Sequence, residues 1–125
     1  MPWRIVVYGG AGIVIFDALA ASAAKTFEFD YALAVFGSFF IYGVVGCLVS
    51  RTGGDLRVSA VAGAAVALVE ATAGWAVAAA IGPGQIEDVG AAEIVGVVLG
   101  AVLVGALVGW VGGRLGNRQP TPGQI

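Results

Sequence analysis

Charged residues are scarce in this chain, and histidine is absent altogether. Only 11% of its 125 residues are charged, whereas an ordinary soluble domain carries about 25%. Hydrophobic residues make up 59%, and the mean hydropathy is +0.97. A soluble fold of this size has too little polar surface to accompany so much apolar side chain. The composition therefore predicts a single-domain membrane protein.

The shortage of metal-binding and nucleophilic side chains excludes several classes of function. Cys47 is the single cysteine, so an intrachain disulfide is impossible and a zinc site would lack its usual ligands. A net charge of −2 provides no basic field for nucleic acid. The glycines of Gly9–Gly12 follow no strand and lie in an apolar stretch, which indicates helix packing rather than nucleotide binding. We expect no enzyme activity, no cofactor, no bound metal and no nucleic-acid partner.

Four apolar stretches are long enough to cross a bilayer as helices of about 20 residues. They are Ile5–Ala24, Tyr31–Val49, Val58–Ile81 and Ala91–Val111. Charged or glycine-containing turns separate them, and residues 112–125 are polar and contain proline. The sequence predicts an all-α bundle of four transmembrane helices within residues 1–111, followed by a short tail.

The basic residues predict the orientation of these helices. In a four-span layout all arginines fall on one side of the membrane, whereas Lys25 lies on the other side with most of the acidic residues. The arginines are Arg4, Arg51, Arg57, Arg114 and Arg118. By the positive-inside rule both termini are cytoplasmic. The bias toward arginine, alanine, glycine and valine is typical of a GC-rich prokaryotic genome, so we expect a multi-pass protein of a prokaryotic plasma (inner) membrane.

An alternative interpretation is that the first segment is a cleaved signal peptide. Arg4 precedes an apolar run, and Ala21–Ala23 has the A-x-A pattern of a cleavage site. The run extends to Ala24, however, which is long for the apolar part of a signal peptide. We therefore predict that the segment is retained as a helix.

The two halves of the chain resemble each other when they are aligned on their charged residues. The coinciding pairs include Arg4 with Arg57, Asp17 with Glu70, Arg51 with Arg114, and Gly46 with Gly109. Charged residues are rare in this composition, so their coincidence indicates a duplicated helical hairpin, residues 4–51 and 57–114. Chance matching among alanine, glycine and valine is the alternative. Parallel repeats of this kind occur in transporters, related by a pseudo-two-fold axis along the membrane normal.

Asp17 and Glu70 lie deep within apolar segments, where a charge costs roughly 2.5–3.5 kcal/mol on insertion scales. Each is about 18 Å from the inner end of its helix at 1.5 Å per residue, so the two are predicted at one depth. If they face each other at the bundle centre, the low dielectric favours a shared proton. Ser38 and Tyr42 are four residues apart, share a helix face, and offer hydroxyl groups at similar depth.

These four residues predict a proton- or cation-binding centre in a small transporter or channel. The alternative is that protonated carboxyl groups only hold helices together, at roughly 0.6 kcal/mol per hydrogen bond in membranes. The chain would then be a non-transporting membrane subunit or assembly protein, and its acids would serve packing or contact with a partner.

Glycines spaced by four or five residues mark the last apolar segment. They are Gly96, Gly100, Gly105, Gly109 and Gly113. Such faces let helix backbones approach closely. We expect them to pack mainly within the bundle, with a second copy or another membrane subunit as the alternative partner besides the lipid bilayer.

Two short stretches resemble known families of similar size. Gly9–Phe29, with an acidic residue followed two turns later by Lys25, is similar to the first helix of small multidrug resistance transporters. That resemblance implies that Asp17 exchanges protons for a cationic drug, although the family has no second acid like Glu70. Phe36–Gly43 resembles the glycine-serine-phenylalanine stretch of small fluoride channels, but the asparagine that precedes that stretch is missing.

Overall fold

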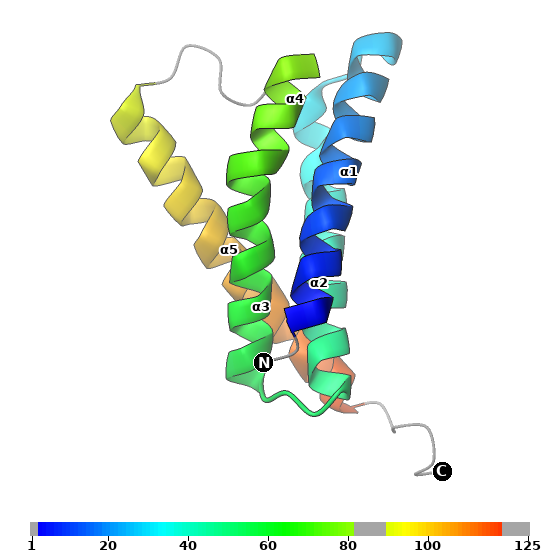
Figure 1. Ribbon diagram of the computed structural model, residues 1–125, viewed down its shortest axis with the longest axis vertical. Helices are drawn as coiled ribbons and strands as arrows, with labels where there is room; N and C mark the ends of the chain where they lie inside the picture. The colour runs from blue at the N-terminus through cyan, green and yellow to red at the C-terminus, as the bar shows by residue number, and fades with distance from the viewer. Residues whose placement is uncertain (1–2, 82–89, 119–125) are drawn as a thin grey trace.

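Over the residues that its computed structural model describes, 3–81 and 90–118, the chain folds into helices joined by short turns, with no strand among them (Figure 1). The α-helices are α1 (Trp3–Phe27), α2 (Val35–Arg51), α3 (Leu56–Val69), α4 (Trp75–Ile81) and α5 (Ala91–Arg118). A 3-10 helix, η1 (Tyr31–Ala34), precedes α2, and a π-helical turn, η2 (Glu70–Gly74), joins α3 to α4. Because α3, η2 and α4 follow one another without a break, they form one long helix.

The prediction of an all-helical fold is confirmed over the described residues. Within the described residues, three helices are long and apolar enough to cross a bilayer, namely α1, the long helix 56–81, and α5. The second predicted span differs, because its first turn is the 3-10 helix η1 and α2 itself has 17 residues. At 1.5 Å per residue α2 covers about 26 Å of a hydrocarbon core of roughly 30 Å.

The α5 helix extends beyond the predicted end of the fourth span at Val111 and reaches Arg118. Its last turns pack closely on α2, which explains why glycines there do not end the helix. A Cβ atom on Gly112 would overlap the carbonyl oxygen of Gly43, and one on Gly116 would lie 2.6 Å from that of Cys47. The rest of the predicted tail, 119–125, and the loop 82–89 lie outside the described residues.

Successive long helices run in opposite directions, so the start of α1, the turn between α2 and α3, and the end of α5 lie at one end of the bundle (Figure 1). In that turn Gly53 has a φ of +97°, which glycine adopts without steric cost. Asp55 caps α3 by accepting a hydrogen bond of 2.8 Å from the backbone N–H of Val58.

Two arginines at this end lie over tryptophan rings. The guanidinium carbon of Arg4 is 5.8 Å from the ring centroid of Trp3, and that of Arg114 is 5.0 Å from the ring centroid of Trp110. Arginine over an aromatic face is a favourable arrangement, and tryptophan is enriched at membrane interfaces. Both pairs are therefore suited to the boundary between headgroups and hydrocarbon.

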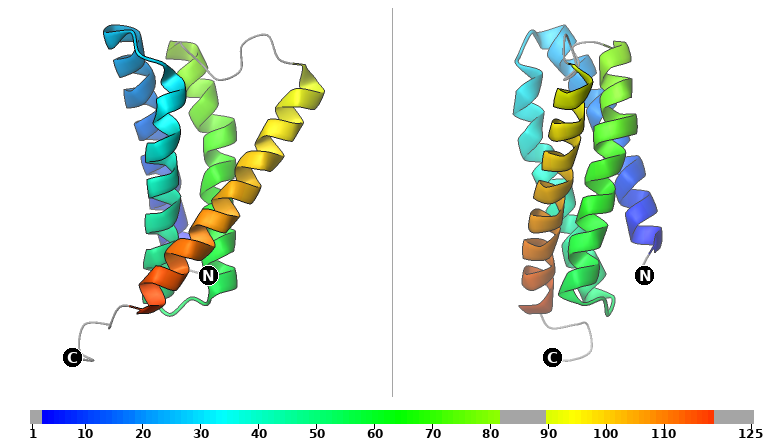
Figure 2. Two further views of the ribbon diagram at one scale, coloured as in Figure 1. Left: turned by 180° about the vertical axis from the view of Figure 1, so that it is seen from behind. Right: turned by 90° about the vertical axis from the view of Figure 1, so that its left-hand side faces the viewer.

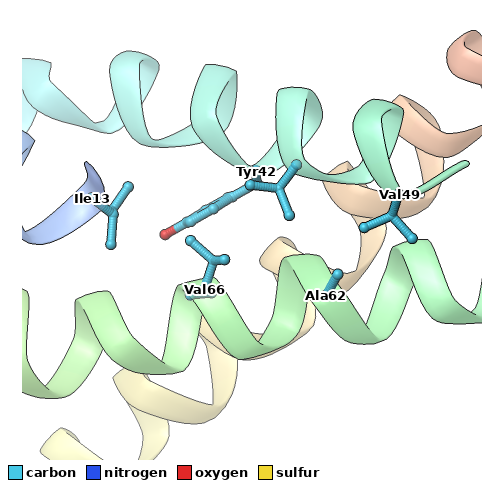
Figure 3. Close-up of a cluster of buried hydrophobic side chains, with 7 residues drawn as sticks. Ile13, Tyr42, Val49, Ala62 and Val66 are labelled. Carbon is cyan, nitrogen blue, oxygen red and sulfur yellow. The ribbon is translucent and has the colours of Figure 1, made fainter. Parts of the chain in front are cut away.

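The main core lies between α1, α2 and α3, where small and branched side chains interlock around Tyr42 (Figure 3). The buried side chains of this core are Ile13, Tyr42, Val45, Val49, Ala62, Val66 and Ala67. At the other end of the bundle, alanines of α1 and α4 form a second small cluster, Ala21, Ala24 and Ala78.

The C-terminal half of α5 packs against the bundle through glycine. A Cβ atom on Gly109 would lie 2.6 Å from the carbonyl oxygen of Ser59 and 2.9 Å from the Cα atom of Gly63. Gly105 and Gly113 likewise lie directly against α3. We call this run of close backbone contacts, from Gly105 to Gly116, the glycine seam.

The N-terminal half of α5 leans away from the bundle (Figure 2). Around Gly96 and Gly100 no heavy atom of another described segment lies within 4 Å of the place that a Cβ atom would occupy. The predicted packing glycines thus divide into three that contact α3 and two that make no close helix contact within the described residues.

We expect Gly109→Ala to lower the free energy of unfolding by about 1–3 kcal/mol, because the added methyl group overlaps the α3 backbone. Gly12→Ala is the matched control, since a Cβ atom there meets nothing within 4 Å. Thermal unfolding in detergent micelles measures both variants. Equal melting temperatures for the two would contradict the glycine seam.

Candidate functional site

Asp17 and Glu70 meet inside the bundle. Asp17 comes from the middle of α1 and is 1% exposed, and Glu70 is the first residue of η2 and is 5% exposed. Both side chains lie against the same face of Gly74 and line one cavity, so the two carboxyl groups are close together. The structure therefore brings together the two acids that the sequence placed at one depth.

Ser38 supplies the hydroxyl group of this centre. It is buried on α2, and its Oγ donates a hydrogen bond to Oε1 of Glu70. The same Oγ lies 3.5 Å from the carbonyl oxygen of Ala34 one turn earlier. A hydroxyl that donates to a carboxylate makes a stronger hydrogen bond than one between neutral groups. Ser38 is thus placed to stabilise negative charge on Glu70.

Tyr42 lies one turn further along α2 and is 3% exposed. Its ring extends into the core beside Ile13 and Val66 (Figure 3), and its ring centroid is 6.4 Å from that of Phe39. Tyr42 also lines the cavity next to the carboxyl groups. It therefore belongs both to the hydrophobic core and to the candidate site.

Gly74 is a site residue that the sequence analysis missed. A Cβ atom on Gly74 would overlap Oδ2 of Asp17 and would lie 3.2 Å from its Cγ atom. The absence of a side chain therefore makes the room that the Asp17 carboxyl group occupies against the long helix. The sequence feature that could have identified Gly74 is its position four residues after Glu70, which places it on the same helix face.

The π-helical turn itself starts at Glu70 and ends at Gly74. Such turns are rare, and they occur frequently at functional sites, because the extra residue per turn interrupts the regular hydrogen-bond ladder. Periodicity alone does not reveal this turn, since the apolar pattern continues across it.

A cavity of about 250 Å³ adjoins the two carboxyl groups. Its polar side chains are those of Asp17, Ser38, Tyr42 and Glu70, together with the indole of Trp75. The α5 helix forms one wall with small and apolar residues, Val97, Gly100, Ala101 and Val104. Among the described residues, the lining includes no lysine or arginine. The cavity thus combines carboxyl and hydroxyl oxygens with an apolar wall.

Carboxyl and hydroxyl oxygens suit a proton or a hard cation more than an anion. Within residues 3–81 and 90–118, no group of three or more histidine, cysteine, aspartate or glutamate side chains is arranged to hold a metal ion. A second hollow, of about 340 Å³, lies between α1 and α2 and is lined by apolar residues, glycines and Tyr8. Its lining has no charged side chain, so it offers nothing comparable to the carboxyl pair.

No protein-family model, curated protein or solved structure matches this chain. The chemistry of the site must therefore be inferred from its own residues.

We expect Gly74→Ala to destabilise the fold by about 1–3 kcal/mol, because the new methyl group competes with the Asp17 carboxyl group for space. In an Asp17→Ala background the competing oxygen is gone, so the same substitution should cost much less. Thermal unfolding of the two single variants and the double variant measures the difference. An equal cost in both backgrounds would show that Gly74 does not accommodate Asp17.

Proposed function

We propose that this protein is a small multi-pass membrane protein that binds and moves a proton or a small cation through the Asp17–Glu70 centre. The observation that carries the proposal is the proximity of two buried carboxyl groups beside a cavity. Ionisable side chains within membrane segments are costly, and those that persist are mostly functional or paired with each other.

The cavity favours this function over a purely structural role. Carboxyl groups that only join helices would be expected in a tightly packed interface, since a void forfeits contacts on every side. Here Ser38 and Glu70 meet at the wall of a space of about 250 Å³ that extends to α5. A space of this size has room for several water molecules or a hydrated cation.

The proposed cycle follows from the charges that the site contains. With one shared proton, the pair carries a single negative charge, and Ser38 donates its hydroxyl hydrogen to Glu70. Binding a second proton or a monovalent cation neutralises the pair. Release on the other side of the membrane returns the pair to its singly charged state, so one positive charge moves per cycle.

The proposed setting is a prokaryotic plasma membrane, with α2 extended by η1 acting as the fourth span. The helix ends that carry Arg4, Arg51, Arg57 and Arg114 face the cytoplasm in this proposal, because basic residues are retained on that side. The two hairpins, 4–51 and 57–114, are proposed to descend from one duplicated hairpin, with Asp17 and Glu70 as equivalent residues.

We expect Asp17→Asn and Glu70→Gln each to reduce proton or cation flux in liposomes to the level of protein-free vesicles. Each substitution removes a titrating group from the pair while keeping the size of the side chain. Glu93→Gln is the matched control, because Glu93 is an exposed acid on α5 outside the cavity lining. Flux is followed with a pH-sensitive dye inside the vesicles, and with Na⁺ and K⁺ gradients in parallel.

Wild-type flux in both variants, accompanied by a lower melting temperature, would contradict transport. That outcome would instead support the alternative of a non-transporting membrane subunit whose acids serve packing and partner contact.

A separate prediction concerns the hydroxyl group. We expect Ser38→Ala to weaken flux and to destabilise the fold by about 1–3 kcal/mol, since a buried carboxyl oxygen loses its donor. Ser22→Ala is the matched control, because Ser22 is exposed and donates to the carbonyl oxygen of Ala18 in its own helix. Identical flux and melting temperatures for the two variants would exclude a role for Ser38.

A further inference from the structure

The two halves of α5 have different environments. From Gly105 onward the glycine seam holds the helix against the backbones of α2 and α3. Before Gly105 the helix leans away from the bundle (Figure 2), and Val95, Val97, Leu99 and Leu103 are each more than half exposed. The wall that α5 gives to the cavity belongs to this less constrained half.

The contacts in this conformation do not explain why residues 96 and 100 are glycines. Glycine within a helix is less favourable than alanine, because it loses more backbone entropy on folding. In the glycine seam that cost is offset by close backbone contact, but a Cβ atom on Gly96 or Gly100 would meet nothing within 4 Å. Glycine at these positions is instead what a second conformation needs, one in which another helix approaches this part of α5 closely.

The cavity identifies the helices that would approach. Gly100 and Val97 line it from α5, and Phe39 and Trp75 line it from α2 and α4. The carboxyl groups themselves are already buried, so bringing these walls together would remove the space beside them. An ion held in that space would then be kept out of contact with lipid, where charge is costly. Gly105, where the glycine seam begins, is the position best suited to the bend that this movement requires, because glycine has the greatest backbone freedom.

We propose that the N-terminal half of α5, residues 91–104, is a movable wall that closes onto α2 and α4 and seals the Asp17–Glu70 centre. The structure then represents the open state, and Gly96 and Gly100 permit the closed state. The role of this wall rests on the proposed function. Ions exchange with the centre in the open state and are occluded in the closed state.

Closure is tested by trapping it with a disulfide. Phe39→Cys and Val97→Cys are combined in a Cys47→Ser background, and the protein in liposomes is oxidised with copper phenanthroline. Disulfide formation requires Cα atoms within about 7 Å, so a bond within one chain reports approach of α5 to α2. The control pair is Phe40→Cys with Leu103→Cys, which lie on the same helices and are 73% and 71% exposed.

We expect the cavity pair to cross-link within one chain and the control pair to remain reduced. Gly100→Leu should slow this cross-linking at least severalfold, because a large side chain obstructs closure, and it should lower flux. Gly12→Leu is the matched control, since Gly12 also has open space around it but lies on α1 outside this cavity. Unchanged cross-linking in Gly100→Leu would overturn the proposal.

Failure of the wall and failure of transport are distinguishable. Flux without any cross-link at Phe39→Cys/Val97→Cys overturns the wall and leaves transport intact. Cross-linking within one chain without flux in the wild type supports the wall and contradicts transport. Cross-links that form only between two chains overturn the wall, and they would show that a second copy fills the space beside α5.

Discussion

The burial of Asp17 and Glu70 close together is the constraint on which the rest of this structure depends. Two carboxyl groups within an apolar bundle are tolerated only if protein surrounds them and supplies hydrogen bonds. The fold meets this requirement from three helices. Gly74 makes space for Asp17 on the π-helical turn, and Ser38 donates to Glu70 from α2. Without the acids, the space beside Gly74 and the hydrogen bond from Ser38 would not be needed at this place.

Glycine contacts determine which part of α5 packs against the bundle. At Gly109 and Gly112 the backbones of neighbouring helices touch, which fixes the C-terminal half of α5. The helix is straight enough that this fixed half carries its other half away from the bundle (Figure 2). The cavity beside Glu70 is the consequence, since α5 forms its outer wall. Tight packing at one end and open space at the other thus arise from one helix.

Apolar length and charge placement were enough to predict the helical class, the helices themselves and the similar depth of Asp17 and Glu70, but not that the two acids lie close together. Helix boundaries were harder, because η1 passes into α2 within apolar sequence and α5 continues past Val111 into a polar, glycine-containing stretch. The π-helical turn and the role of Gly74 depend on contacts between α1 and the long helix, which single-sequence periodicity does not contain. For the same reason the sequence did not distinguish Gly96 and Gly100 from the glycines of the seam.

Infrared difference spectroscopy of the carboxylic acid bands tests most directly whether Asp17 and Glu70 act as one centre. Spectra of the protein in bilayers at acidic and alkaline pH would be compared for wild type, Asp17→Asn and Glu70→Gln. Because the two carboxyl groups lie close together inside the bundle, removing either one should shift both the frequency and the titration of the remaining band. A wild-type spectrum equal to the sum of two unshifted single-acid spectra would contradict the shared centre.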